Sequence, residues 1–230
     1  MRPTVLLFDI DGTLLSSMGV GRKALDRAFE LLHGRPDAVN FALDGMTDGC
    51  IVQQALQGIG ASADDESVGR VLDAYIDALE VGVAQASDEN YRLHVGMREA
   101  VALGLAQKNT VVGLGTGNIR RGAKIKLDRV ALYEPFQFGG FGCDHNERGM
   151  LIRRGAERGA ALLNLSLEAC RVVVIGDTPK DIHAAQFIGA ESVGVGTGRF
   201  APAQLLAAGA TAAFADLSAP GALAAVLGEA

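Results

Sequence analysis

Four short and almost uninterrupted apolar runs constrain what this chain can fold into. They cover residues 4–10, 110–116, 171–177 and 192–196, and a weaker run covers residues 137–141. Short runs of this kind are typical of strands that are covered on both faces, as in a parallel sheet. Helix-like segments follow at 97–107, 119–132, 150–163 and 181–188. The alternation predicts an α/β fold with a doubly wound, Rossmann-like parallel-sheet core.

The segment between the first two runs does not alternate. Residues 16–87 show three helical patterns, at 23–32, 50–57 and 67–86, joined by turns that contain Gly and Asp. We therefore predict an inserted α-helical domain over 16–87, with short polar hinges at 16–17 and 87–90. Residues 1–15 and 88–230 would form the α/β core. Its Ala-rich tail after residue 201 is expected to form one or two helices and a short strand at 212–215.

Charge and composition exclude several classes of partner. The 230 residues include 27 acidic and 21 basic side chains, no Trp and no basic run, which argues against nucleic acid or an anionic membrane. No apolar stretch approaches the ~20 residues that a membrane span requires. The three cysteines, Cys50, Cys143 and Cys170, form no CxxC pair, which favours a reducing compartment. We expect a soluble, cytoplasmic protein that is a monomer or small homo-oligomer.

Acidic residues stand where the predicted strands end. Asp9 and Asp11 end the first run, and Asp177 ends the third. Carboxylates at positions i and i+2 of an extended chain project from the same side. If the two strands are neighbours, the three carboxylates converge and repel one another unless they are protonated or bridged by a cation. An all-oxygen cluster suits Mg²⁺. The alternative is that Asp9 and Asp11 only cap a turn.

The second run ends in residues that suit an anion. Thr116 offers a hydroxyl donor, Gly117 lets the backbone approach a ligand closely, and Asn118 opens a helix whose N-terminal amides favour negative charge. A phosphate site is therefore predicted at this strand end. The alternative is a plain turn with Asn118 as the helix N-cap.

Three of these strand ends resemble motifs of the haloacid dehalogenase superfamily of aspartyl phosphohydrolases. The sequence FDIDGTL at 8–14 resembles the first motif, LGTGN at 114–118 the second, and IGDTPKDI at 175–182 the fourth. The helical insert lies where that superfamily carries its helical cap. Phosphoglycolate phosphatase and its relatives look most similar. Thr13 also matches the phosphatases, whereas related phosphomutases often carry Val there.

The resemblance implies a role for each acidic residue. Asp9 would be the nucleophile that attacks phosphorus, and Asp11 would protonate the leaving alcohol and then activate water. Mg²⁺ would be held by the Asp9 carboxylate, the Asp11 backbone carbonyl and Asp177. Asp181 would support the water ligands of the metal without touching it. Thr116, Gly117 and Asn118 would bind the phosphate.

The function implied is a Mg²⁺-dependent phosphatase that acts on a small phosphorylated metabolite. Two alternatives stay open. A phosphomutase of the β-phosphoglucomutase type would differ only in what receives the phosphoryl group. A non-catalytic metal- or phosphate-binding relative would lack turnover altogether.

The resemblance also implies a lysine that neutralises the nucleophile and the phosphate, and one predicted helix offers Lys124 and Lys126. At ~100° per residue the apolar positions of this helix form a stripe about 80° wide that should face the sheet. Lys126 lies about 20° outside this stripe and Lys124 about 60° outside its other edge. Lys126 is therefore predicted to reach the strand ends and to be catalytic, with Lys124 at the surface.

The insert gives weaker signals. Arg22 and Lys23 are the candidates for reading an anionic substrate, and the alternative is a solvated first turn of a helix. Met46 stands where relatives would carry Arg or Lys, so the roles of Met46, Thr47 and Asp48 stay open. Asp144 and His145 follow the weaker run at 137–141, and they are predicted to lie in a solvated loop.

Overall fold

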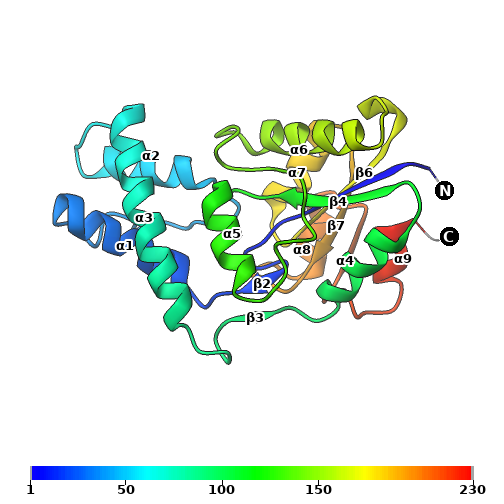
Figure 1. The fold of residues 1–230 in the computed structure, drawn as a ribbon, viewed down its shortest axis with the longest axis horizontal. Helices are drawn as coiled ribbons and strands as arrows, with labels where there is room; N and C mark the ends of the chain where they lie inside the picture. The colour runs from blue at the N-terminus through cyan, green and yellow to red at the C-terminus, as the bar shows by residue number, and fades with distance from the viewer. Residues whose placement is uncertain (1, 229–230) are drawn as a thin grey trace.

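A six-stranded parallel sheet forms the centre of the molecule in the computed structural model, which describes residues 2–228 (Figure 1). The predicted α/β fold is confirmed. In sheet order the strands are β5 (Gly139–Gly140), β4 (Thr110–Gly115), β1 (Thr4–Phe8), β6 (Arg171–Gly176), β7 (Glu191–Val195) and β8 (Ala212–Phe214). The predicted core also includes residues 1, 229 and 230, which lie outside the described range.

The first strand lies in the middle of the sheet. Leu6 of β1 is in register with Val112 of β4 on one side and with Val173 of β6 on the other. The chain builds the sheet outward from β1 through β4 to β5, then returns to β6 and continues to β8. The carboxyl ends of β4, β1 and β6 therefore lie together where the strand order reverses, which is the usual ligand position in such sheets.

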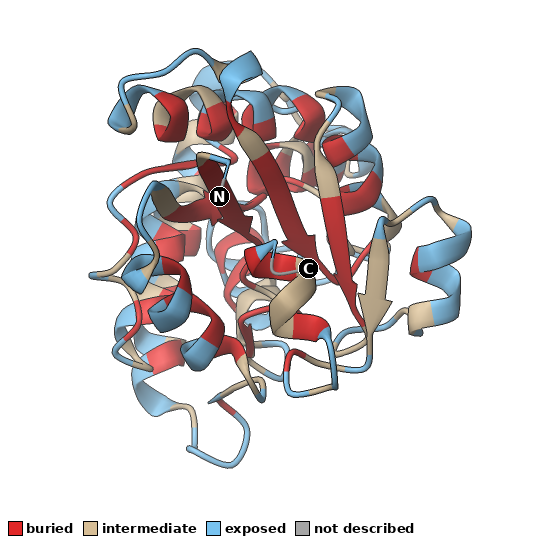
Figure 2. Cartoon of the chain, turned by 90° about the vertical axis from the view of Figure 1, so that its right-hand side faces the viewer, coloured by how far each residue is buried: buried red, intermediate tan, exposed pale blue. Residues whose placement is uncertain are grey.

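Helices cover both faces of the sheet (Figures 1 and 2). Leu6 and Phe8 of β1 pack with residues of α4, α5 and α9, whereas Val5 and Leu7 pack with residues of α6 and α7. The helix bounds are α4 (Met97–Ala106), α5 (Arg120–Asp128), α6 (Arg148–Leu162), α7 (Pro179–Phe187), α8 (Pro202–Ala207) and α9 (Ala222–Leu227). Helix α5 ends earlier than predicted because the chain turns, with Ala131 at a φ of 50°.

Three further helices, α1 (Val20–His33), α2 (Asp48–Gly58) and α3 (Asp65–Gln85), lie together beyond the carboxyl edge of the sheet (Figure 1). The chain enters this helical segment through β2 (Leu15–Ser16) and leaves it near β3 (Arg92–Leu93). These two strands pair antiparallel, with Leu15 opposite Leu93. The division of the chain at residues 16–87 stays a prediction. Among the described residues, no helix is long and apolar enough to cross a membrane.

The backbone of helix α6 lies in direct contact with the backbone of β5 at the edge of the sheet. A Cβ on Gly140 of β5 would lie 1.8 Å from the Leu151 carbonyl oxygen, and a Cβ on Gly155 would lie 2.6 Å from the Gly140 nitrogen. Neither contact could be relieved by turning a side chain. The sequence therefore needs glycine at both positions to seat α6 on β5.

This contact predicts opposite effects for one substitution at two helical glycines. Gly155→Ala should destabilise the protein by about 1–3 kcal/mol because the added methyl overlaps the β5 backbone. Gly69→Ala in α3 has no atom within 4 Å of the new Cβ. It should stabilise the protein by about 0.5–1 kcal/mol through helix propensity. Urea denaturation of both variants checks this, and equal effects would contradict the packing described.

Candidate functional site

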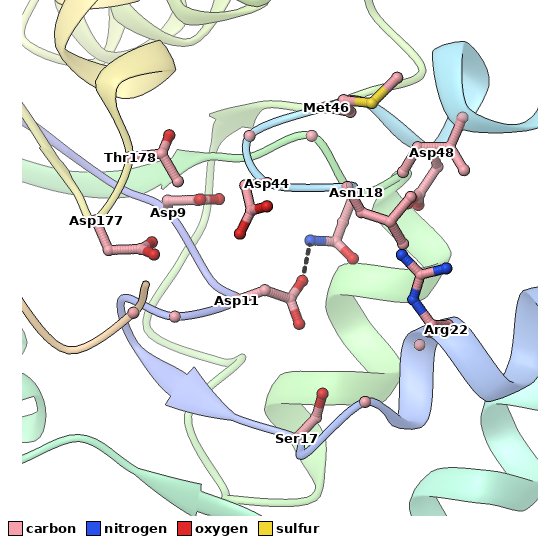
Figure 3. Close-up of a pocket in the computed structure, with 18 of the residues that line it drawn as sticks. Asp9, Asp11, Ser17, Arg22, Asp44, Met46, Asp48, Asn118, Asp177 and Thr178 are labelled. Carbon is pink, nitrogen blue, oxygen red and sulfur yellow. Dashed lines mark hydrogen bonds between the residues drawn. The ribbon is translucent and has the colours of Figure 1, made fainter. Parts of the chain in front are cut away.

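Three buried carboxylates meet at the carboxyl edge of the sheet. Asp9 follows β1, Asp177 follows β6, and Asp181 lies in the first turn of α7. One oxygen from each lies within 4.8 Å of the others. Figure 3 shows Asp9 and Asp177 close together, while Asp11 turns toward Asn118. The structure thus brings Asp9 and Asp177 together, as the strand order requires.

Glycines make room for the Asp177 carboxylate. A Cβ on Gly12 would lie 2.4 Å from Asp177 Oδ2, and a Cβ on Gly198 would lie 1.8 Å from the same atom. Gly12 also has a φ of 81°, in the left-handed region that favours glycine. The Thr13 hydroxyl donates a hydrogen bond to Asp177 Oδ1 at 2.8 Å. The turn after β1 and the loop after β7 therefore fix where this carboxylate points.

The charge of this cluster is only partly balanced by protein groups. Burial raises the pKa of Asp9 to about 6, although Arg148 acts to lower it and Asp181 raises it further. Burial, followed by repulsion from Asp181 and Asp9, raises the pKa of Asp177 well above its usual value. Buried carboxylates that resist ionisation in this way suit a divalent cation, and an all-oxygen donor set fits Mg²⁺.

Both oxygens of Asp181 already accept hydrogen bonds. Oδ2 accepts from the Thr178 hydroxyl at 2.7 Å and from its backbone nitrogen at 3.0 Å, which closes a capping box at the start of α7. Oδ1 accepts from Arg148 Nε at 2.8 Å. With its lone pairs engaged, Asp181 is better suited to support a metal site than to bind the metal directly.

Arg148 is the site residue that the sequence analysis missed. It is the first residue of α6, and its side chain is only 8% exposed. Its Nη2 lies 2.9 Å from Asp9 Oδ2 and also contacts Asp181. The only sequence signal was indirect: a helix that follows the run predicted at 137–141 has its N-terminus at the same edge of the sheet, but nothing marked Arg148 within it. The cation beside the predicted nucleophile is therefore Arg148 rather than Lys126.

Lys126 lies beside Asp11. Its ammonium donates to Asp11 Oδ2 and to Asn118 Oδ1, both at 2.6 Å. Asn118 Nδ2 donates to Asp11 at 2.8 Å and to the Thr116 hydroxyl at 2.9 Å. Desolvation alone would raise the pKa of Asp11, but Lys126 and the hydrogen bonds outweigh it and the pKa is lowered. Lys124 is exposed and pairs with Asp128 one turn along α5.

The helical segment contacts the core through residues 45–50. The Asp48 nitrogen donates to the Gly117 carbonyl oxygen at 2.8 Å, and Asp48 Oδ2 accepts from the Ile119 nitrogen at 2.9 Å. The Thr47 hydroxyl donates to the Asn146 carbonyl oxygen at 3.2 Å. A Cβ on Gly117 would lie 2.1 Å from the Met46 carbonyl oxygen. Residues 46–48 thus join the helical segment to the loop after β4.

A cavity of about 490 Å³ lies between this helical segment and the strand ends. Asp9, Asp11 and Asp177 line its core side, and Arg22 lines its other side. Arg22 directs Nη1 at the Val39 carbonyl oxygen (2.5 Å) and Nη2 at the Phe41 carbonyl oxygen (2.7 Å). Its hydrogen bonds therefore hold the loop after α1, and its contact with a substrate stays a prediction.

Three other predicted residues lie away from this cavity. Lys23 is exposed and lines a separate groove between α1 and α3. Asp144 pairs with Arg158 at 2.6 Å, and its side chain is 17% exposed. The prediction of a solvated loop is therefore wrong for Asp144, because an ion pair to α6 holds it. His145 is exposed, and its Nδ1 accepts from the Glu147 nitrogen at 2.9 Å.

The buried position of Asp48 gives a pH-dependent prediction. Burial raises its pKa to about 6, and Lys126 and the Ile119 nitrogen only partly offset this. For an acid whose pKa is raised by folding, the protonated form favours the fold. The contribution of Asp48 to the free energy of unfolding is therefore fully present below its unfolded pKa near 4 and is lost as the pH rises through about 6.

Asp48→Asn removes this titration while keeping an acceptor for Ile119. The stability of the variant relative to the wild type should rise by up to about 3 kcal/mol between about pH 4 and pH 8. Chemical denaturation over this pH range measures the difference. A difference in stability that stays constant with pH would show that folding does not raise the pKa of Asp48.

Comparison with known proteins agrees with the motifs. The model of a family described as HAD-hydrolase-like matches residues 148–219, which span α6 to the loop after β8. Over these residues the match confirms the predicted resemblance to the haloacid dehalogenase superfamily. No curated protein sequence matches the chain.

Solved structures share the fold over nearly the whole chain. A hydrolase from Pseudomonas syringae is 22% identical, with a TM-score of 0.68 over 94% of each chain. CbbY from Rhodobacter sphaeroides, solved in complex with phosphate, is 16% identical, with a TM-score of 0.73 over 98% of this chain and 99% of CbbY. A mutant of CbbY was solved with xylulose-(1,5)bisphosphate and gives the same values. At these identities the likeness shows the fold alone.

Proposed function

We propose that the protein is a Mg²⁺-dependent phosphatase that hydrolyses a small phosphorylated metabolite through a phospho-aspartyl intermediate on Asp9. The observation that carries this proposal is the arrangement around Asp9. Its buried carboxylate lies between the Arg148 guanidinium and the Asp177 carboxylate and opens into the cavity. The family match and the phosphate-bound neighbour support the same chemistry.

The first step would transfer the phosphoryl group to Asp9. An oxygen of Asp9 attacks phosphorus, the bond to the leaving alcohol breaks, and Asp11 gives that alcohol a proton. Arg148, the Thr116 hydroxyl and the amides that open α5 would bind the phosphate oxygens. Asp9, Asp177 and the Asp11 backbone carbonyl would hold Mg²⁺, which supplies positive charge to the nucleophile and the phosphate when it is bound.

The second step would release phosphate. Asp11 takes a proton from water, the resulting nucleophile attacks the phosphorus of the phospho-aspartate, and the bond from phosphorus to the Asp9 oxygen breaks. The contacts of Asp11 suit this step, because Lys126 and Asn118 favour its ionised form. The negative charge of an incoming phosphate would raise the pKa of Asp11 again, which favours the protonated form needed in the first step.

The cytoplasm is the compartment we propose. Cys50, Cys143 and Cys170 are all free thiols, and a reducing compartment would keep them so. The proposal also keeps the phosphomutase alternative as an outcome of the test below.

The function is tested with the purified chain, p-nitrophenyl phosphate and Mg²⁺. Phosphate release should require Mg²⁺, stop on chelation and resume when Mg²⁺ is restored. Asp9→Asn should lose more than about 99% of the activity, because an amide is a very poor nucleophile. Activity in excess chelator would contradict the metal-dependent mechanism. Turnover only with an added sugar bisphosphate would identify a mutase, and no turnover would favour a non-catalytic relative.

The buried cations Arg148 and Lys126 should both contribute to turnover, whereas the exposed Lys124 should not. Arg148→Ala and Lys126→Ala should each lower kcat/KM on the order of 100-fold or more, as lost charge stabilisation typically does. Lys124→Ala is the matched control, because Lys124 is exposed on the same helix as Lys126. It should leave kcat/KM nearly unchanged. A larger loss in Lys124→Ala than in Lys126→Ala would refute this assignment.

A further inference from the structure

The Tyr75 hydroxyl lies at the wall of the cavity without a protein partner. Tyr75 belongs to α3, is 1% exposed and lines the cavity, yet within residues 2–228 its hydroxyl makes no hydrogen bond. Tyr91 differs, because its hydroxyl donates to the Lys126 carbonyl oxygen at 2.9 Å. The oxygen of Tyr75 is not among the fully buried unpartnered atoms of the described residues, so it is open to the cavity, where water or a ligand can pair with it. The Tyr75 hydroxyl is therefore available to a ligand in the cavity.

Lys126 offers a second donor at the same place. The point that a Cβ on Gly21 would occupy lies 3.5 Å from Lys126 Nζ and 3.8 Å from Tyr75 Oη. An ammonium group has three N–H donors, and Lys126 uses two of them for Asp11 and Asn118. The third is left for a group beside Gly21. The absence of a side chain at Gly21 keeps this space open.

Asp48 adds an acceptor to the same wall. One of its carboxylate oxygens accepts from the Ile119 nitrogen, and the residue lines the cavity. No described residue donates to its other oxygen. Tyr75 stays protonated, since burial, followed by the charges of Asp48 and Asp11, raises its pKa well above the usual value. This wall therefore combines donors and acceptors, as a hydroxyl group of a ligand requires.

The cations that line the cavity are already engaged. Lys126 pairs with Asp11, Arg148 pairs with Asp9, and Arg199 at the rim lies 3.4 Å from Asp44. Arg22 directs both Nη atoms at backbone carbonyl oxygens. Figure 3 shows Arg22 with Asp48 on the side of the cavity opposite Asp9 and Asp177. Among the described residues, Lys126, Arg148 and Arg199 thus have a carboxylate partner, and Arg22 has backbone carbonyl oxygens as hydrogen-bond acceptors.

We propose that the substrate is a phosphate monoester whose organic part is neutral and hydroxylated, such as a polyol or sugar phosphate, and that Tyr75 binds one of its hydroxyl groups. A carboxylate or a second phosphate beside Gly21 would face the Asp48 carboxylate, and the charge of Lys126 at this place is already balanced by Asp11. This inference rests on the proposed phosphatase activity and names its substrate class. Tyr75 is the specificity-determining residue.

Two pairs of substrates of matched size test the charge preference with the Mg²⁺-loaded wild-type protein. The pairs are glycerol 3-phosphate with 3-phosphoglycerate, and 2-hydroxyethyl phosphate with 2-phosphoglycolate. In each pair a hydroxymethyl group replaces a carboxylate. The kcat/KM should be at least tenfold higher for the hydroxylated member of each pair. Equal or reversed values, with p-nitrophenyl phosphate still hydrolysed, would overturn this inference alone. No hydrolysis of any monoester would overturn the proposed function with it.

Tyr75→Phe tests whether the Tyr75 hydroxyl binds the substrate. The ratio of kcat/KM for glycerol 3-phosphate to that for propyl phosphate, which lacks hydroxyl groups, should fall about tenfold when the hydroxyl is removed. Tyr91→Phe is the matched control, since it removes a hydroxyl that bonds only to the backbone. It should lower Tm and leave this ratio unchanged. Equal losses on both substrates in Tyr75→Phe would overturn the role of Tyr75.

Gly21→Ala gives an independent measurement. Its new methyl would lie at ordinary contact distance from Lys126 and Tyr75, so the fold is expected to tolerate it. The methyl would occupy the space proposed for the hydroxyl of the substrate. KM for glycerol 3-phosphate should rise several-fold, and more than KM for propyl phosphate. A KM that stays at the wild-type value for glycerol 3-phosphate would place the organic part elsewhere.

Discussion

The repulsion among three buried carboxylates is the constraint on which the rest of this structure depends. One oxygen each of Asp9, Asp177 and Asp181 lies within 4.8 Å of the others, and among the cations of residues 2–228 only Arg148 pairs with two of them. Such a cluster is costly without further positive charge. The capping box of α7 and the glycines around Asp177 hold the carboxylates in place against this repulsion. The fold thus holds carboxylates that repel one another unless they are protonated or share a cation.

The core of the fold could be predicted because its signals are local. Apolar runs marked the strands, and the polar residues directly after them marked the edge where a site would form. Asp9 and Asp177 converge because β1 and β6 are neighbours, and the alternation of strands and helices implies such an edge. The face of α5 that carries Lys126 followed from helical periodicity for the same reason.

What could not be predicted depends on contacts between distant residues. Arg148 follows a polar stretch with no periodicity, and its partners come from β1 and α7. The ion pair of Asp144 with Arg158 joins a loop to a helix face in the same way. The strands β2 and β3 are only two residues long and are separated by the whole helical segment, so neither leaves a pattern. Helix α5 ends at Asp128 although no Gly or Pro marks the turn.

The pairing of β2 with β3 has a consequence for how the helical segment can be displaced. Two independent flexible connections would let the segment rotate about any axis. Here the outgoing and returning chains are hydrogen-bonded in register, with Leu15 opposite Leu93 and Ser16 opposite Arg92. Any rotation that preserves these bonds must carry both strands as one ribbon. A two-stranded ribbon bends more easily out of its own plane than within it. The paired connection therefore favours rotation of the helical segment about one axis.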